Sequence, residues 1–395
     1  MVVGLKRNGT RAFAVATVVC AALSPAALVA AGGAAAQGRD GRDAAAPRLV
    51  RTPPKRVIRA ADGVLSAGAP GVAVEYRDAR KPALSWSVRR GTGDLASGAP
   101  VPPDASFRIG SVTKTYLATA VLGAVGEGRI SLDDTLGHWL PGVLPRLDER
   151  TITVRMLLDH TSGVPDPSPR LLAHPALFGK GAVTPADLVG KARNLPPVAA
   201  PGVQFTYSNA DYWLLAMILE RATGQSYAKQ IETRVLRPLG LGHTVLPSDT
   251  TSLPSPFLHG YTLRPGRPPL DVSAFNSSWA SSSGGIVSTT ADLDRFASAL
   301  LGGRLMAPAE LAQMKRGVRV PANPMGVSVY GLGLTRMRLP CGVTLYGNMG
   351  GLAGYTTWVQ STTDGSRSIA VAANTDELPR IDRSIGKVVD AAFCG

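Results

Sequence analysis

Ser111 and Lys114 lie three residues apart at the expected start of a helix. Residues at this spacing share one face of a helix, so the serine hydroxyl and the lysine amine can meet. A serine becomes a strong nucleophile only when a neighbouring base takes its proton, and lysine can do so if burial lowers its pKa. The N–H groups of the helix N-terminus would then face the developing oxyanion. The pair predicts acyl transfer through a serine nucleophile.

A second group of polar residues, Tyr207-Ser208-Asn209, follows Pro201-Gly202 and precedes an expected helix. A tyrosine beside a serine and a lysine can relay a proton, particularly where a charged lysine stabilises the phenolate. Asn209 offers both an acceptor and donors to a substrate amide. Each motif also has an ordinary structural interpretation when taken singly. Ser-x-x-Lys is often a solvated helix face, and the other two residues could be a core tyrosine and a helix cap.

A third segment, Tyr346-Gly347-Asn348-Met349-Gly350-Gly351, lies between two strand-like runs. Glycines there allow a substrate backbone to approach a strand edge closely. A substrate could bind along that edge as an added strand, with a backbone N–H completing an oxyanion hole. The structural alternative is a glycine-rich strand turn.

Hydrophobic periodicity predicts the elements that position these residues. Alternating apolar residues predict strands over 72–76 and 84–88, and further strands are expected at 345–346, 355–359 and 369–373. Helices are expected at 111–126, 154–158, 185–192, 212–224, 227–236, 291–301 (capped by Thr290) and 380–393. Strands at both ends with helices between them predict an α+β fold. Its antiparallel sheet is flanked by helices and built from both chain ends, with an inserted, mainly α-helical domain.

This pattern divides the chain of 395 residues into four parts. Residues 1–36 have a basic start, an apolar stretch and small residues at 34–36, which predicts a secretory signal peptide; a retained membrane anchor is the alternative. Residues 37–60 are basic and contain prolines, which predicts a flexible leader. An α/β domain is expected over 61–115 and 290–395, and the helical domain over 116–289.

The formal net charge of +14 raises the question of nucleic acid. The basic leader lacks interleaved aromatic residues and follows an export signal, so no nucleic-acid partner is expected and an anionic cell envelope fits better. The five histidines are scattered, and no metal or other cofactor is expected. No stable membrane span is expected once the signal is removed. With Cys20 in the signal, Cys341 and Cys394 would form one disulfide or remain two buried thiols.

The order of Ser-x-x-Lys, Tyr-x-Asn and a glycine-rich strand resembles the D-alanyl-D-alanine carboxypeptidase and class C β-lactamase family of penicillin-recognising serine hydrolases. The resemblance runs from about Gly63 to Cys394 and includes the further segments Leu157–Gly163, Gly284–Thr289 and Tyr330–Leu334. It implies a β-lactamase/transpeptidase-like fold. The Leu157–Gly163 segment is structural in this family, so His160 is not expected to be the catalytic base.

The resemblance also implies a role for each candidate site residue. Ser111 would be acylated, and Lys114 and Tyr207 would activate it. Asn209 would bind the acyl-side amide, and the N–H groups of Ser111 and Gly351 would form the oxyanion hole. The remaining assignments are a cleft-lining Trp279 and a disulfide between Cys341 and Cys394, as in secreted carboxypeptidases of this kind.

One residue departs from the family pattern. Asn348 stands where the family usually has His or Lys, which would attract a substrate carboxylate. The loss of such a charge-assisted hydrogen bond costs about 1.5–3 kcal/mol, roughly tenfold to a hundredfold in affinity. Arg336 or Arg338, just before this strand, would have to compensate, although ordinary exposed arginines are the simpler interpretation of both.

Three functions therefore remain open, all for a secreted protein. The first is a D-alanyl-D-alanine carboxypeptidase acting on peptidoglycan-type peptides. The second is an esterase, amidase or β-lactamase of the same fold that acts on a neutral substrate, which an asparagine at position 348 would suit. The third is a catalytically silent penicillin-binding-like module, and the intact set of Ser111, Lys114, Tyr207 and Asn209 argues against it.

Overall fold

The computed structural model describes residues 52–172, 181–247, 249–264, 266–323, 325–376 and 378–394. The described residues form one compact unit. The predicted signal peptide and residues 37–51 of the predicted leader lie outside the described residues. The signal peptide remains a prediction.

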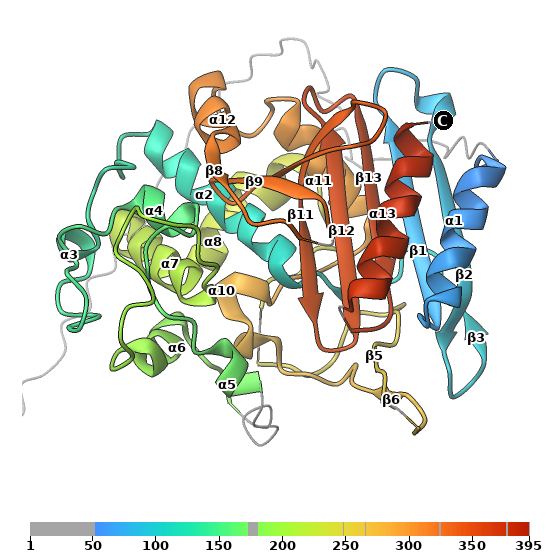
Figure 1. Cartoon of the computed structure of the whole chain (residues 1–395), viewed down its shortest axis with the longest axis horizontal. Coiled ribbons are helices and arrows are strands. Elements are labelled where there is room, and N and C mark those ends of the chain that lie inside the picture. Colours follow the sequence, from blue (N-terminus) through green and yellow to red (C-terminus); the bar gives the residue numbers. More distant parts are fainter. Residues whose placement is uncertain are drawn as a thin grey trace, which may run out of the picture. The chain divides into compact units, whose positions relative to one another are not determined.

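The centre of this unit is a nine-stranded antiparallel sheet (Figure 1). Its order is β3-β2-β1-β13-β12-β11-β10-β9-β8, so β1 from the start of the chain pairs with β13 from its end. The predicted fold class, with an antiparallel sheet made from both chain ends, is confirmed. The strands are β1 (Gly71–Asp78), β2 (Trp86–Asp94), β3 (Ala99–Pro100), β8 (Gly317–Arg319), β9 (Val327–Gly331), β10 (Thr335–Arg338), β11 (Thr344–Leu352), β12 (Tyr355–Thr362) and β13 (Arg367–Ala373). Short two-stranded pairs join β4 (Phe107–Arg108) to β7 (Val287–Ser288) and β5 (Tyr261–Thr262) to β6 (Leu270–Asp271).

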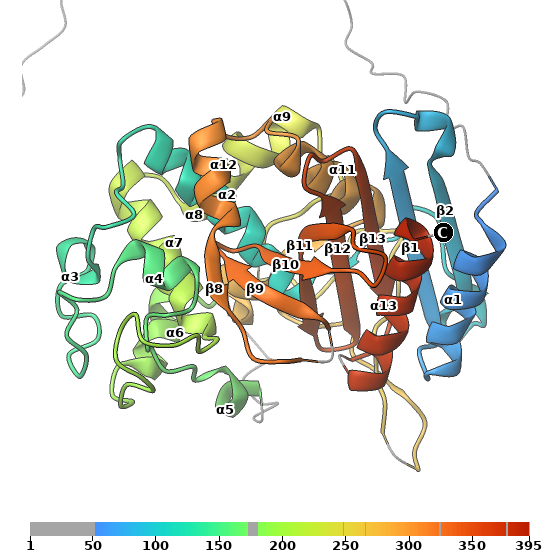
Figure 2. The same cartoon turned by 45° about the horizontal axis from the view of Figure 1, so that its top comes forward.

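Helices α1 (Lys55–Ser66) and α13 (Pro379–Phe393) lie side by side on one face of the sheet, and α11 (Thr290–Leu301) covers the other face (Figures 1 and 2). The two neighbouring helices are antiparallel, because residues near the start of each donate to carbonyl oxygens at the end of the other. A disulfide joins Cys394, at the end of α13, to Cys341, in the turn between β10 and β11. This is the pair that the resemblance implies.

The prediction of a flexible leader over 37–60 is wrong for residues 55–60, which begin helix α1. Val57, Ala61 and Val64 recur with helical spacing on one face of the helix, and all three are fully buried in the core between the helix and the sheet. The basic residues that suggested a solvated segment occupy the opposite, exposed face of the same helix. Burial of the apolar stripe therefore outweighs the charge of the segment.

The helices between the two halves of the sheet pack around α2 and α7, and α2 is buried along most of its length. They are α2 (Thr113–Gly126), α3 (Leu136–Trp139), α4 (Val154–Leu158), α5 (Ser168–Leu172), α6 (Pro185–Ala192), α7 (Asn209–Thr223), α8 (Tyr227–Ile231), α9 (Arg237–Leu239), α10 (Ser281–Gly284) and α12 (Pro308–Lys315). A large apolar core joins this layer to the sheet. The division into domains at residues 116 and 289 remains a prediction.

Several element boundaries differ from the sequence-based expectation. The second strand begins at Trp86, because Pro82–Leu84 forms a 3₁₀ turn. The N-cap of α11 is Thr289 rather than Thr290, since the Thr289 side chain accepts a hydrogen bond from the Asp292 N–H. The run after α8 continues as one π-helical turn over Glu232–Leu236.

Candidate active site

Ser111 lies in a single 3₁₀ turn, η2 (Gly110–Val112), which leads directly into α2. The α-helix therefore begins two residues later than predicted, but the three-residue spacing still brings Lys114 back to the serine. The fully buried Lys114 Nζ lies 3.2 Å from Ser111 Oγ. It also donates to the Asn209 Oδ1 at 2.7 Å and to the Ser283 carbonyl oxygen at 2.8 Å. Ser111 Oγ thus lies beside Nζ together with two carbonyl oxygens. An uncharged amine can donate its two protons to those carbonyl oxygens and accept the Ser111 proton with its lone pair.

Tyr207 approaches the nucleophile from the loop before α7. Its hydroxyl donates to Ser111 Oγ at 2.7 Å, and its side chain is 38% exposed, so the phenol faces the substrate side of the serine. The Lys114 Nζ lies 4.8 Å from the centre of the Tyr207 ring. The lysine amine and the tyrosine hydroxyl thus both contact the same serine oxygen. An uncharged Lys114 amine can accept the Ser111 proton, whereas the Tyr207 phenol holds a proton that it can donate.

We expect Tyr207→Phe to lower kcat/KM by about 100-fold or more, because the general acid–base hydroxyl is lost while the ring remains. The measurement is steady-state hydrolysis of a p-nitrophenyl ester, with the thermal midpoint recorded for each protein. Tyr76→Phe is the matched control, since Tyr76 stacks on Trp86 in the separate core of the α1 and α13 face. A Tyr207→Phe enzyme as active as this control would exclude the phenol from proton transfer.

The two predicted oxyanion-hole donors meet where η2 packs against β11. A Cβ on Gly110, whose φ is +53°, would lie 2.8 Å from the Gly351 nitrogen. A Cβ on Gly350 would collide with the Ile109 carbonyl and lie 2.8 Å from the Ser111 nitrogen. Glycine is therefore required at both positions for this close approach. The backbone nitrogens of Ser111 and Gly351 both lie at this junction, as the resemblance implies.

The same part of β11 offers a strand edge to a substrate. The pairing of β10 with β11 ends at Gly347, whereas β12 continues to pair along β11 as far as Leu352. Within the described part of the chain, residues 348–352 therefore have a strand partner on one side only. An extended substrate beside Gly351 would place its scissile carbonyl near Ser111.

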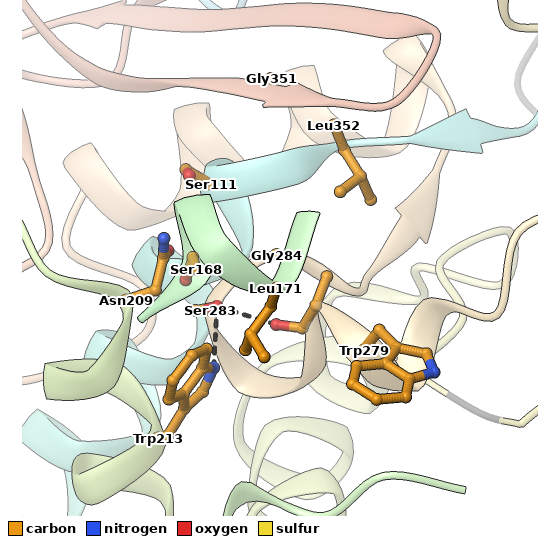
Figure 3. Close-up of a pocket in the computed structure, with 11 residues that line it drawn as sticks. Ser111, Ser168, Leu171, Asn209, Trp213, Trp279, Ser283, Gly284, Gly351 and Leu352 are labelled. Atoms are coloured by element: carbon orange, nitrogen blue, oxygen red, sulfur yellow. Dashed lines mark hydrogen bonds between the residues drawn. The ribbon is translucent and has the colours of Figure 1, made fainter. Parts of the chain in front are cut away.

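Two cavities meet at the nucleophile, and Ser111, Asn209 and Gly351 line both of them. The smaller cavity has a volume of about 90 Å³. Figure 3 shows Ser111 and Asn209 at one end of it and Trp279 at the other. The indole of Trp213 donates to Ser283 Oγ at 3.0 Å, which fixes one wall. Trp279, which the resemblance places in the substrate cleft, is among the residues that line this cavity.

The larger cavity has a volume of about 500 Å³ and contains the phenol of Tyr207. Among the described residues that line it, none has a charged side chain. The polar ones are Ser111, Tyr207, Asn209, Asn323, Tyr330, Thr335 and Asn348; the others are Phe205, Val320, Pro321, Ala322, Met325, Val327, Met349 and Gly351. This side of the site is therefore uncharged.

Asn348 lies in the wall of this cavity but directs its amide into the protein. Its Nδ2 donates to Thr115 Oγ1 at 3.0 Å, and its Oδ1 accepts from the Met349 N–H at 2.9 Å. The residue is almost fully buried. Neither Arg336 nor Arg338 is among the described residues that line the cavity, which agrees with the simpler interpretation of both as ordinary arginines outside the site.

Asn209 contributes to the site in a way that the sequence did not predict. Its Oδ1 accepts from Lys114, and its Nδ2 donates to Asp166 Oδ2 at 3.1 Å, so it helps to fix the amine. A role for the other Nδ2 proton in binding a substrate amide remains a prediction. Sequence reasoning missed Asp166 and the Ser283 carbonyl. Asp166 carries no spacing signal, and a main-chain carbonyl has no signature in a sequence.

In the part of the chain that the structure describes, no three His, Cys, Asp or Glu side chains gather in a group able to hold a metal ion. The described helices also include none that is long and apolar enough to cross a membrane.

Comparison with known proteins gives the site its context. A family model described as Beta-lactamase matches residues 44–392. The structure of a D-stereospecific amidohydrolase from Streptomyces sp. is 35% identical, with a TM-score of 0.76, over 87% of this chain and 99% of that chain. The D-amino acid amidase from Ochrobactrum anthropi SV3 is 25% identical, also with a TM-score of 0.76, over 86% of this chain and 97% of that chain.

Two further relatives are named as an esterase and as a penicillin-binding protein. Esterase EstB of Burkholderia gladioli is 35% identical over 181 residues, which span 41% of this chain and 44% of the esterase. Penicillin-binding protein 4* of Bacillus subtilis (strain 168) is 26% identical over 317 residues, which span 77% of this chain and 68% of that protein. The match to the family model, together with the amidohydrolase structure covered almost entirely, shows that this chain belongs to the β-lactamase family of serine hydrolases, with a β-lactamase/transpeptidase-like fold.

Proposed function

We propose that the chain is a serine amidase or esterase that cleaves substrates whose leaving group is uncharged, with D-amino acid amides as the preferred class. The observation that carries this proposal is the larger cavity beside Ser111, whose described lining has no charged side chain and includes Asn348 in place of a basic residue.

The larger cavity is assigned to the leaving group because it contains Tyr207. In acyl transfer, the proton taken from the nucleophile must reach the departing nitrogen or oxygen, so the group that delivers it faces the leaving side. The smaller cavity does not include Tyr207 among its described lining residues. It would hold the acyl part of the substrate between Leu171, Trp213 and Trp279.

Each step of the proposed reaction uses a contact present in the structure. Lys114 takes the Ser111 proton as Oγ attacks the carbonyl carbon, and the N–H groups of Ser111 and Gly351 stabilise the oxyanion. Tyr207 gives its proton to the leaving amine or alcohol and remains as a phenolate beside the protonated Lys114, until the attacking water returns a proton to it. Water then releases the acyl group by the reverse path.

The preference for D-amino acid derivatives rests on the relatives. The amidohydrolase from Streptomyces is named as D-stereospecific, and the Ochrobactrum enzyme is named as a D-amino acid amidase. Both are matched over nearly their whole length. EstB supports an esterase activity less directly, because under half of its length is matched.

A D-alanyl-D-alanine carboxypeptidase remains the second candidate, and the likeness to penicillin-binding protein 4* favours it. That reaction needs a group that binds the terminal carboxylate of the leaving D-alanine. A penicillin carboxylate needs the same group. The uncharged wall around Asn348 argues against both substrates.

A secreted location is part of the same proposal. The N-terminal pattern of basic, apolar and small residues supports it. The disulfide between Cys341 and Cys394 supports it as well, because such bonds persist in oxidising compartments. Contact with an anionic cell envelope would follow from the basic leader.

The test is a comparison of kcat/KM for D-phenylalanine amide, L-phenylalanine amide, a p-nitrophenyl ester and an acyl-D-alanyl-D-alanine peptide. We expect the D-amide and the ester to be turned over faster than both the L-amide and the peptide. A clear preference for the peptide with its free carboxylate would reject the proposal in favour of the carboxypeptidase.

The substitution Asn348→Lys should shift this balance. A lysine side chain is longer than asparagine, and if it leaves the Thr115 contact and extends into the larger cavity its amine would attract a carboxylate. The kcat/KM of the peptide relative to the amide should then rise about tenfold or more. Ala322→Lys is the matched control, since Ala322 lines the same cavity at an exposed position. An equal rise in both variants would show a general effect of charge and would contradict a specific role for position 348.

A further inference from the structure

His160 is completely buried and packs against the ring of Tyr207. It is not among the described residues that line either cavity. Its backbone φ is +61°, the left-handed conformation that few non-glycine residues adopt. Its carbonyl oxygen accepts from the Thr206 N–H at 2.8 Å, and its Nδ1 lies 3.3 Å from the Ser208 nitrogen. The imidazole ring lies 4.4 Å, centre to centre, from the Tyr207 ring. His160 therefore contacts Tyr207 and the residues on both sides of it.

Asp211, in the first turn of α7, holds the imidazole. Its Oδ2 lies 2.8 Å from His160 Nδ1, and its Oδ1 accepts from Ser162 Oγ at 2.5 Å. Both side chains of the pair are fully buried. Because Asn209 lies two residues before Asp211 in the same helix turn, the pair connects the tyrosine loop to the residue that holds Lys114.

Burial determines the charge of this pair. It raises the pKa of Asp211 well above its ordinary value and lowers the pKa of His160 well below it, and the charge of Lys114 lowers the His160 pKa further. Both shifts favour the uncharged forms of the pair, an imidazole beside a carboxylic acid. This state suits the Ser208 N–H, which also points at Nδ1. The other rings that face the imidazole belong to Phe205, Tyr207, Tyr212 and Tyr330.

We propose that His160, held by Asp211, is a positioning residue that fixes the Tyr207 hydroxyl against Ser111. The inference rests on the proposed function, in which Ser111, Lys114 and Tyr207 carry out acyl transfer. His160 acts through the tyrosine loop and does not exchange a proton with the substrate. Its removal should therefore slow acylation while leaving substrate affinity nearly unchanged.

The experiment measures two rates for the purified full-length protein. One is covalent labelling of Ser111 by a fluorophosphonate probe, and the other is p-nitrophenyl acetate hydrolysis with kcat and KM separated. We expect His160→Phe, which keeps a ring but loses the Nδ1 acceptor, to reduce the labelling rate and the kcat/KM of ester hydrolysis about 10- to 100-fold. His138→Phe, at an exposed position in α3, is the matched control and should keep the wild-type rates.

Two substitutions of Asp211 supply a rescue test that does not depend on folding of the His160 variant. Asp211→Asn keeps a donor for Nδ1 and an acceptor for Ser162, so it should stay within about threefold of wild type. Asp211→Ala keeps neither and should be as slow as His160→Phe. Thermal midpoints measured for every variant separate positioning from loss of the fold.

The outcomes distinguish this inference from the proposed function. Wild-type protein that neither labels at Ser111 nor turns over the ester would reject the proposed function itself. If the wild type reacts, the inference is overturned by a folded His160→Phe variant at wild-type rates. It is also overturned if folded Asp211→Asn and Asp211→Ala variants are labelled equally slowly.

Discussion

Ser111→Ala is expected to abolish hydrolysis, with kcat reduced by about four orders of magnitude or more, because no other group can form the acyl-enzyme. The fold should survive. The Ser111 side chain contacts Lys114 and Tyr207 at the junction of two cavities, and removing its hydroxyl takes away no apolar packing. The measurement is turnover of a p-nitrophenyl ester and of D-phenylalanine amide, with the thermal midpoint as the check on folding.

Ser384→Ala is the control for this variant, since Ser384 lies on α13, on the far side of the sheet from the site. It should retain wild-type kinetics. Both substrates must lose activity in Ser111→Ala, because the proposed mechanism uses one nucleophile for amides and esters. Substantial turnover by the folded Ser111→Ala protein would reject Ser111 as the nucleophile.

Lys114→Met should have the second largest effect, a loss of about 10³- to 10⁴-fold in the acylation rate. Methionine has a similar unbranched shape and suits a buried position, so the packing around α2 should persist. The amine contacts Ser111 Oγ, Asn209 Oδ1 and the Ser283 carbonyl oxygen, so it connects the nucleophile to the residue that would bind the substrate amide. The substitution removes the base that takes the Ser111 proton and also the contact that orients Asn209, and both losses slow acylation.

A double mutant shows whether the lysine acts through the serine. If Lys114 only activates Ser111, the combination of Lys114→Met and Ser111→Ala should be no slower than Ser111→Ala alone. Near-normal acylation by Lys114→Met would exclude this lysine as the principal base. Tyr207 would then be the remaining candidate, since its hydroxyl also contacts Ser111 Oγ.

The central part of the site could be predicted from the sequence because it depends on local geometry. The three-residue spacing of Ser111 and Lys114 places them on one face of a helical turn, and this holds although the turn is 3₁₀ rather than α. The alternating apolar residues of β1 and the strands near the C-terminus likewise required a buried sheet. The pairing of β1 with β13 follows once both ends of the chain supply strands.

The parts that could not be predicted depend on contacts between distant segments. The basic residues of α1 led to the prediction of a flexible segment, because the role of its apolar residues depends on packing against the distant strands of the sheet. The pairing of His160 with Asp211 joins residues 51 positions apart, and no local pattern connects them. The orientation of Asn348 depends on Thr115, which lies 233 positions earlier. Without that contact, the sequence could not show whether Asn348 binds a substrate carboxylate or forms part of an uncharged wall.

The most direct test of acyl transfer at Ser111 is the intact mass of the protein, quenched with acid early in its reaction with p-nitrophenyl acetate and followed by peptide mapping. We predict a mass increase of one acetyl group, located on Ser111 and absent from Ser111→Ala. An acetyl group carried by another residue with Ser111 unmodified, or an equal adduct on the Ser111→Ala protein, would contradict it.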